Sequence, residues 1–310
     1  MDQWGVSDIP DQNGRTVLIT GANSGLGLRS AEALAATGAR VLLACRNAEK
    51  AATALESVKA GATGPTPEVV ALDLADLDSV AACASTVDGA VEHLDVLVNN
   101  AGVMAVPRRR TSAGFELQFG TNHLGHFALT GGVLPTLLRA PSPRVVNVSS
   151  NAHKFGSMRW DDLNWQRGRY SKWRAYGQSK LANLLFSSEL QRRAIAAATP
   201  LVVASAHPGY ASTHLAAVGP EMAGHRLAGM LTSLGDRLLA QPDDMGALPQ
   251  LYAATMPDVG PDDYFGPDGP GELRGHPTRV GRSRAASDLA AGARLWRRSE
   301  ELTGVSYPWP

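Results

Sequence analysis

Short apolar runs alternate with helical patterns along most of the chain. The runs that indicate buried strands cover residues 15–20, 40–45, 68–72, 94–98, 144–148 and 201–206. Patterns with a helical period cover residues 28–37, 48–59, 77–91, 112–138, 172–197, 245–254 and 287–302. Continuous apolar strands that alternate with helices are typical of a parallel sheet with helices on both faces. We therefore predict an α/β fold with a doubly wound, mostly parallel, seven-stranded sheet.

Three stretches fall outside this alternation. Residues 151–174 form an insertion with three tryptophans and several arginines. Residues 210–240 are apolar and weakly charged, which indicates short helices and loop, and residues 261–277 are so dense in Gly and Pro that we expect irregular backbone there. No linker is long enough to divide the chain, so residues 1–310 are predicted to form a single domain.

A glycine-rich turn joins the first strand to the first helix. It contains Gly21, Asn23, Ser24, Gly25, Leu26 and Gly27. The layout of strand, glycine-rich turn and helix start lets backbone amides and a helix N-terminus face a pyrophosphate. A glycine-rich turn alone is often only a turn, but the flanking strand and helix favour a dinucleotide-binding Rossmann domain.

Composition narrows the class of partner and the location. The chain has 310 residues, of which 29 are basic and 29 acidic, so its formal net charge is zero. A neutral balance gives no reason to expect nucleic acid or an anionic membrane surface as a partner. Cys45 and Cys83 lie in apolar segments without metal-like spacing, so we interpret them as reduced core residues and expect no metal. No secretory signal or membrane anchor is visible, and we expect a cytoplasmic protein.

Tyr176 and Lys180 lie four residues apart in a helical segment and therefore share a helix face. A neighbouring ammonium group favours phenolate over phenol, so it should lower a tyrosine pKa that is about 10 when unperturbed. Such a tyrosine can exchange protons near neutral pH. Taken alone, the pair fits a solvated helix face as well as an active site.

Several motifs in one order make the chain resemble the short-chain dehydrogenase/reductase superfamily over essentially its whole length. They are Thr20-Gly21 with Gly25 and Gly27, Asp73, Asn99-Asn100-Ala101-Gly102, Asn122, Ser150, Tyr176 with Lys180, and Pro208-Gly209. The segment from Thr121 to Phe127 and the wide gap between Ser150 and Tyr176 are similar to the branch that contains the retinol dehydrogenases and many uncharacterised bacterial oxidoreductases. Most members hold a short gap there.

The resemblance implies a role for each matched position. Tyr176 is expected to be the general acid/base, Lys180 to lower its pKa and bind the nicotinamide ribose, Ser150 to bond the substrate oxygen, and Asn122 to hold a water that relays protons to Lys180. Ser149 is the neighbouring candidate, but adjacent strand side chains point to opposite faces. The expected cofactor-binding residues are Gly21, Asn23, Ser24, Gly25, Leu26, Gly27, Arg46, Asp73, Leu74, Asn99, Ala101, Gly102, Tyr176, Lys180, Pro208, Gly209 and Thr213.

Some of these residues have a second interpretation. Arg46 follows the second strand, where an arginine suits a 2′-phosphate, so we favour NADP(H) over NAD(H), although a solvated arginine is the alternative. Asp73 fits the adenine ring or a cap for the helix that begins near Asp76. Asn99 fits a turn former or a brace for the cofactor-side loop. His123 and His126 share a helical face, but packing or hydrogen bonding is favoured over a metal pair.

The expected function is an NADPH-dependent carbonyl reductase, or the reverse alcohol dehydrogenase, on a partly apolar small-molecule ketone or aldehyde. The alternative is a cofactor-binding regulatory or interaction protein with this fold and no turnover. The insertion at 151–174 fits a partner surface, a substrate lid or a small packed subdomain. Relatives pair through the long helices near residues 112–138 and 172–197, so a homo-oligomer is possible, and the insertion could alter that surface.

Overall fold

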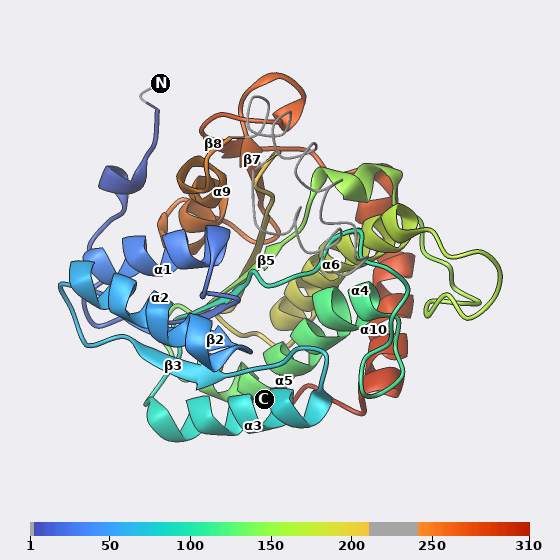
Figure 1. Ribbon diagram of the computed structural model, residues 1–310, viewed down its shortest axis with the longest axis horizontal. Coiled ribbons are helices and arrows are strands. Elements are labelled where there is room, and N and C mark those ends of the chain that lie inside the picture. The colour runs from blue at the N-terminus through green and yellow to red at the C-terminus, as the bar shows by residue number, and fades with distance from the viewer. Residues whose placement is uncertain (1–2, 211–240) are drawn as a thin grey trace.

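A twisted sheet runs through the centre of the molecule, with the strand order β3-β2-β1-β4-β5-β6-β7-β8 (Figure 1). The structure is a computed structural model that describes residues 3–210 and 241–310. The strands are β1 (Thr16–Thr20), β2 (Arg40–Cys45), β3 (Glu68–Ala71), β4 (Val96–Asn99), β5 (Arg144–Val148), β6 (Val202–Ala206), β7 (Tyr264–Pro267) and β8 (Pro277–Arg279). All neighbours pair in parallel except β7 and β8, which are antiparallel. The doubly wound, mostly parallel α/β sheet is confirmed.

The described residues contain eight strands rather than the seven predicted, and the extra strand arises where irregular backbone was expected. Tyr264 and Phe265 pair with Ser205 and Ala206 of β6, and the chain then returns as β8. Both aromatic side chains are buried. The density of Gly and Pro led to the prediction of irregular backbone. Pro is nevertheless tolerated at the edge of a sheet, where one side of the backbone lacks a partner, so this short hairpin can form there.

Helices cover both faces of the sheet, as expected. The α-helices are α1 (Gly25–Ala36), α2 (Ala48–Gly61), α3 (Leu77–Ala90), α4 (Leu117–Phe119), α5 (Gly125–Leu138), α6 (Lys172–Ala196), α9 (Asp243–Thr255) and α10 (Leu289–Thr303). Short helical turns are η1 (Val6–Asp8), η2 (Gly120–Leu124), η3 (Asn151–Phe155), η4 (Pro270–Glu272) and η5 (Arg284–Ser287). One hydrophobic cluster joins the sheet to α1, α2 and α9, and another joins it to α3, α5 and α6.

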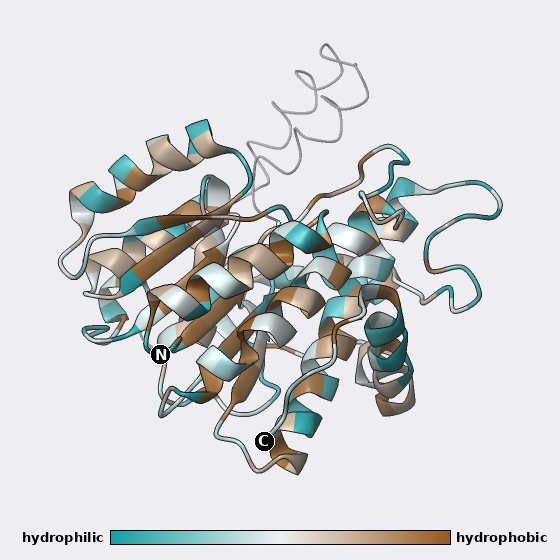
Figure 2. Ribbon diagram, turned by 90° about the horizontal axis from the view of Figure 1, so that it is seen from below, coloured by the Kyte–Doolittle hydropathy of each residue, from teal (hydrophilic) through white to brown (hydrophobic). Residues whose placement is uncertain are grey.

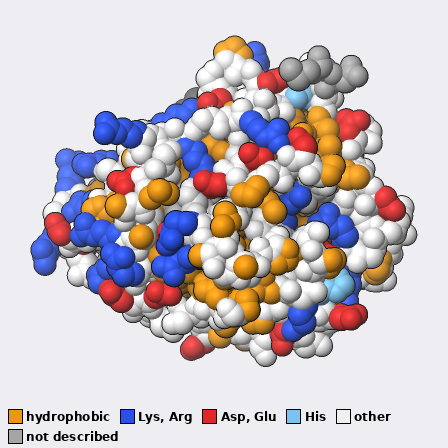
Figure 3. All heavy atoms as spheres, turned by 180° about the vertical axis from the view of Figure 1, so that it is seen from behind, with side chains coloured by type: hydrophobic (Ala, Val, Ile, Leu, Met, Phe, Trp, Pro, Cys, Tyr) orange, Lys and Arg blue, Asp and Glu red, His pale blue; other side chains and the backbone are white. Residues whose placement is uncertain are grey.

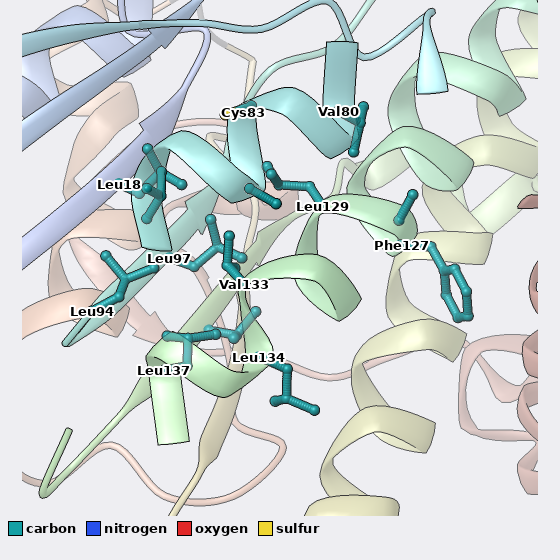
Figure 4. Packing of buried hydrophobic residues seen from close by; sticks show 14 of the residues in the cluster. Leu18, Val80, Cys83, Leu94, Leu97, Phe127, Leu129, Val133, Leu134 and Leu137 are labelled. Atoms are coloured by element: carbon teal, nitrogen blue, oxygen red, sulfur yellow. The ribbon is translucent and has the colours of Figure 1, made fainter. Parts of the chain in front are cut away.

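Strand β1 is buried along its whole length, which explains why its sequence shows no alternation. Val17 and Ile19 pack into the cluster under α1 and α9, whereas Leu18 packs with α3 and α5 on the other face. Figure 4 shows Leu18, Leu97, Val133 and other members of the second cluster in close contact. Figure 2 shows the strands as the most hydrophobic ribbons, enclosed by helices of mixed hydropathy.

The helix predicted for residues 112–138 begins later and is not uniform. It starts at Leu117 because the Glu116 carboxylate accepts hydrogen bonds from the backbone N–H groups of Gln118 and Phe119. The next turn, η2, is a π-helix, a form that is rare and often occurs at functional sites. This irregular turn carries Asn122.

Among the described residues, no helix is long and apolar enough to cross a membrane. Both cysteines are free and buried, as predicted. Figure 3 shows basic side chains gathered along one edge of the face seen from behind. The net charge of the chain is zero, but its basic side chains are therefore not evenly spread over this face.

Candidate active site

The glycine-rich turn follows β1 at the centre of the sheet, next to the point where the strand order reverses between β1 and β4. Gly21 and Gly25 have positive φ of 68° and 53°, which glycine adopts without strain. A Cβ on Gly27 would overlap the Gly21 carbonyl oxygen, so glycine lets α1 start close to β1. Within the described residues, the side chain of Ser24 makes no capping bond to α1, which leaves the first-turn N–H groups of that helix available to a phosphate.

The loop after β4 is tied to the glycine-rich turn by Thr20. The Thr20 hydroxyl oxygen accepts hydrogen bonds from the backbone N–H groups of Asn100 and Ala101, at 3.0 and 2.9 Å. The Asn100 side chain in turn donates to the Thr20 carbonyl oxygen at 2.8 Å. The two loops at the cofactor edge of the sheet are therefore one hydrogen-bonded unit.

Asn99 does not brace this loop with its side chain, contrary to the prediction. Its amide donates to Thr130 on α5 at 3.0 Å and to Asn147 on β5 at 2.8 Å. The side chain of Asn99 is buried and joins β4 to its neighbours, whereas Asn100, one position later, points toward the glycine-rich turn. Adjacent residues at a strand end face opposite sides, and the sequence does not show which asparagine faces the cofactor.

His126 links Thr20, which joins the two loops, to the backbone of η2. Its Nδ1 lies 3.0 Å from the Asn122 carbonyl oxygen, which can only accept, so this nitrogen carries the proton. Its Nε2 then accepts from the Thr20 hydroxyl at 2.9 Å. Burial lowers the pKa of His126 to about 4, which keeps the ring neutral. Hydrogen bonding was the favoured interpretation of this histidine, and it is confirmed.

His123 lies in η2 and is buried. Its Nε2 lies 2.8 Å from the Ser299 hydroxyl, and burial lowers its pKa to about 3. No group of three or more potential metal ligands occurs among residues 3–210 and 241–310.

Ser150 and Tyr176 meet at the carboxyl end of β5. The Ser150 side chain is close enough to act on the Tyr176 phenol, although 26 positions separate them in the chain. Gly156 and Gly177 allow this approach, because a Cβ on Gly156 would overlap the Gly177 carbonyl oxygen, so η3 can lie directly on α6. Ser149 faces away, and its hydroxyl donates to the Lys180 carbonyl oxygen at 2.9 Å. Strand alternation therefore selects Ser150, as expected.

Lys180 lies one helical turn beyond Tyr176 and is buried. Its Nζ donates to the Val148 carbonyl oxygen at 3.0 Å and lies 5.8 Å from the centre of the Tyr176 ring. A Cβ on Gly102 would come within 3.6 Å of the same Nζ, so the loop after β4 passes directly over this ammonium group. Tyr176, Lys180 and the loop after β4 thus converge on one point.

Asn122 lies beside Lys180 and holds the loop after Gly102 in place. Its amide oxygen accepts from the Val103 N–H at 2.8 Å, and its amide nitrogen donates to the Val103 carbonyl oxygen and to Ser179 Oγ at 2.9 and 3.0 Å. The structure therefore assigns both amide protons to protein partners. The expected water relay to Lys180 stays a prediction.

Burial sets the pKa values of the central pair. It raises the pKa of Tyr176 to about 12, with a smaller lowering by the nearby Ser150 side chain. It lowers the pKa of Lys180 to about 8. The predicted lowering of the tyrosine pKa by Lys180 is not observed, because the loss of solvent has the largest effect on the phenol.

Arg46 and Asp73 follow β2 and β3 and lie 3.8 Å apart, with the Arg46 side chain 71% exposed. The cap interpretation of Asp73 is wrong, since Asp76 itself caps α3 through the Asp78 N–H. Asp73 instead accepts from the Ala75 N–H.

Leu26 and Leu74 lie at the dinucleotide edge with buried side chains, and Leu74 packs against Gly125 at the start of α5. Pro208 and Gly209 follow β6, and Gly209 has a φ of 66°, while their predicted contact with the cofactor stays a prediction. Thr213 and the rest of residues 211–240 lie outside the described residues.

The insertion packs against the protein rather than standing apart. Trp165 is buried, with the Arg159 guanidinium 4.1 Å from its ring centre. The Tyr170 hydroxyl donates to Glu116 at 2.9 Å. Trp173 is the exception, because it is 49% exposed and its ring meets the Tyr176 ring edge-on at 6.4 Å. Packing, the favoured interpretation of the tryptophans, holds for Trp165.

Comparisons with known proteins agree with this geometry. The family model for short chain dehydrogenases matches residues 15–223. Human retinol dehydrogenase 13 is 38% identical over 297 residues, covering 95% of this chain and 86% of that protein. Mouse retinol dehydrogenase 14 is 40% identical over 315 residues, covering 98% and 90%.

Solved structures give the same result. A crystal structure of an uncharacterised protein from Mycobacterium paratuberculosis is 45% identical, with a TM-score of 0.82 and 99% of both chains covered. A short chain dehydrogenase from Escherichia coli in complex with NADPH is 25% identical, with a TM-score of 0.59 and 79% and 92% covered. The chain therefore belongs to the short-chain dehydrogenase/reductase family of oxidoreductases, in its retinol dehydrogenase-like branch.

Proposed function

We propose that this chain uses NADP(H) to interconvert a ketone or aldehyde and the corresponding alcohol on a partly apolar small molecule. The observation that carries the proposal is that Lys180 lies beside the Tyr176 ring and beneath Gly102, with Ser150 acting on the Tyr176 phenol. Two hydroxyl donors, an ammonium group and the dinucleotide edge of the sheet meet there. This is the set of groups that reduction of a carbonyl requires.

The glycine-rich turn, the α1 N-terminus and Gly102 fit a dinucleotide, because each brings backbone rather than a side chain to the edge of the sheet. When bound, the nicotinamide supplies or accepts the hydride. The protein side chains handle the charge and the proton. Ser150 and Tyr176 donate hydrogen bonds to the substrate oxygen as negative charge develops on it, and Tyr176 transfers its proton to that oxygen. In the reverse direction, Tyr176 accepts the proton of the alcohol.

Exposed apolar side chains around Tyr176 support a partly apolar substrate. Phe155 is 59% exposed and touches the helix at Gly177, and Trp173 lies against the Tyr176 ring. Leu273, which is 50% exposed, follows η4 close to Gly209. Exposed apolar side chains are normal when scattered, but Phe155 and Trp173 beside Tyr176, together with Leu273 beside Gly209, can hold an apolar substrate.

Arg46 supports the preference for NADP(H). It follows β2 and stays largely exposed, so its guanidinium can leave Asp73 at small cost and pair with a 2′-phosphate. A similar solved structure holds NADPH. Comparable kcat/KM values with NADH and NADPH would remove this part of the proposal.

The test is NADPH oxidation by the purified protein against a panel of carbonyl compounds that includes retinal, which the names of the relatives suggest. Tyr176→Phe should lower kcat by about a hundredfold or more, the usual loss when a general acid is removed. Tyr252→Phe is a matched control, because Tyr252 lies on α9 and bonds Asp258. Normal turnover by Tyr176→Phe would show that the mechanism is wrong. Cofactor binding without turnover on any substrate would favour the regulatory alternative.

The cytoplasmic location of the protein stays a prediction.

A further inference from the structure

Glu272 stands out because its backbone is in the left-handed region, with a φ of 56°. It follows Gly271, whose φ of 65° suits glycine, and it ends η4. A side chain with a Cβ is unfavourable in this conformation and persists only where the surroundings hold it. What holds Glu272 is therefore informative about its role.

The Glu272 carboxylate joins two segments of the candidate active site. One oxygen accepts from Lys154 Nζ at 3.0 Å and from His207 Nε2 at 3.1 Å. Lys154 lies in η3, which begins directly after Ser150, and His207 directly precedes Pro208-Gly209. The backbone adds a third link, since the Asn151 amide donates to the Glu272 carbonyl oxygen at 3.2 Å.

The two ring nitrogens of His207 connect the Glu272 carboxylate to the backbone of Gly209. The Gly209 N–H donates to His207 Nδ1 at 3.2 Å, so Nδ1 carries the lone pair and Nε2 carries the proton that Glu272 accepts. The ring is buried, and a Cβ on Gly266 of β7 would overlap it, so the ring has little room to turn. Glu272, His207 and Gly209 form one directed chain of hydrogen bonds.

The same turn also contacts the Pro208-Gly209 turn from its other side. The Leu273 carbonyl oxygen accepts from the Tyr210 N–H at 2.7 Å. A Cβ on Gly209 would overlap that carbonyl oxygen, so the two backbones are in close contact. The segment that contains Glu272 thus fixes the end of β6 through both a side chain and its backbone.

We propose that Glu272 is a positioning residue that sets the Pro208-Gly209 turn, and with it the nicotinamide half of the dinucleotide, relative to Ser150. The inference rests on the proposed function in one respect, that a dinucleotide occupies this edge of the sheet. The position of the turn itself is independent of any ligand, and the two can be tested separately.

The first measurement is hydrogen exchange on the cofactor-free protein. Glu272→Ala should speed exchange of the Gly209 and Tyr210 amides about tenfold or more, since loss of a charge-assisted hydrogen bond is of this size. Exchange in residues 21–27 should not change. Unchanged exchange at Gly209 would overturn the inference, whether or not the protein binds a cofactor.

The second measurement is binding of NADPH and of adenosine 2′,5′-bisphosphate, which lacks the nicotinamide half. Glu272→Ala should weaken NADPH binding about tenfold and leave the bisphosphate within about twofold of wild type. An equal loss for both ligands would indicate a merely structural role and overturn the inference. If the wild-type protein binds no dinucleotide, the proposed function fails, while the exchange measurement still decides the role of Glu272.

Three further variants separate the carboxylate from folding. Glu272→Gly relieves the left-handed strain, so it should fold at least as well as wild type and show the same losses as Glu272→Ala. Glu272→Gln keeps an oxygen acceptor for His207 and should restore most of the NADPH affinity. Glu301→Ala, which removes an exposed carboxylate paired with Arg298 on α10, is the matched control and should behave as wild type. Wild-type behaviour of Glu272→Gly would overturn the inference.

Discussion

At the scale of single residues, burial rather than charge pairing sets the proton affinity of the central lysine. Lys180 is 4% exposed, and its pKa falls to about 8 from the usual 10.5. Its Nζ finds one protein acceptor in the described residues, the Val148 carbonyl oxygen, which also accepts from Asn183 at 3.1 Å. The ammonium group is therefore held in place for a ligand at some cost to the stability of the cofactor-free protein.

Lys180→Met should stabilise the cofactor-free protein at pH 7. The folded pKa lies below the unfolded one, so the unfolded chain holds the extra proton between about pH 8 and 10.5, and wild-type stability rises with pH in that window. Methionine removes a penalty of about 3 kcal/mol at pH 7, and this advantage should shrink by about 2 kcal/mol at pH 9.5. Val148 keeps Asn183 as a donor. Urea unfolding at both pH values measures the difference, and a less stable Lys180→Met at pH 7 would contradict the prediction.

At the scale of elements, the C-terminal segment covers α5 and α6, the two long helices that we predicted as a possible pairing surface. Trp296 of α10 packs against Phe127 of α5 at 5.1 Å and stacks with Phe186 of α6 at 6.0 Å. Tyr307 donates to the Phe127 carbonyl oxygen, and a Cβ on Gly131 would come within 2.9 Å of its ring. We predicted that the insertion at 151–174 could alter this surface, but α10 and the residues after it occupy it.

We expect the protein not to dimerise through α5 and α6. Hydrogen exchange of α5 and α6 should not depend on protein concentration, because burial of Trp296 and Tyr307 already covers the apolar surface that such pairing would use. Trp296→Ala should lower the free energy of unfolding by about 3–5 kcal/mol, as loss of a buried tryptophan does. A stable dimer in which hydrogen exchange of α5 and α6 slows with concentration would contradict the expectation.

At the scale of the molecule, the sequence predicts what local pattern determines and misses what distant contacts determine. Continuous apolar runs identified six strands of the sheet, and strand alternation predicted correctly that Ser149 and Ser150 face opposite sides, while the family position favoured Ser150. The roles of Asn99 and His126 depend on partners 31 to 106 positions away, which no local pattern contains. The strained Glu272 was missed for the same reason, since its carboxylate partners lie 65 and 118 positions earlier.

Acid should destabilise the whole molecule through three buried histidines. Burial lowers the pKa of His126 and of His207 to about 4, and that of His123 to about 3, from the usual 6.5. Each folded pKa lies below the unfolded one, so the unfolded chain binds more protons and stability is lost as pH falls from about 6.5 toward 4. Each histidine should cost about 2 kcal/mol between pH 7 and 5.

His123→Gln tests the contribution of one of these histidines, because glutamine can still bond Ser299 but does not titrate. Urea unfolding of wild type and variant at pH 7 and pH 5 should show a loss in the variant that is smaller by about 2 kcal/mol. The comparison cancels the contribution of carboxylates, which titrate alike in both proteins. Parallel losses in the two proteins would show that His123 does not resist protonation in the folded state.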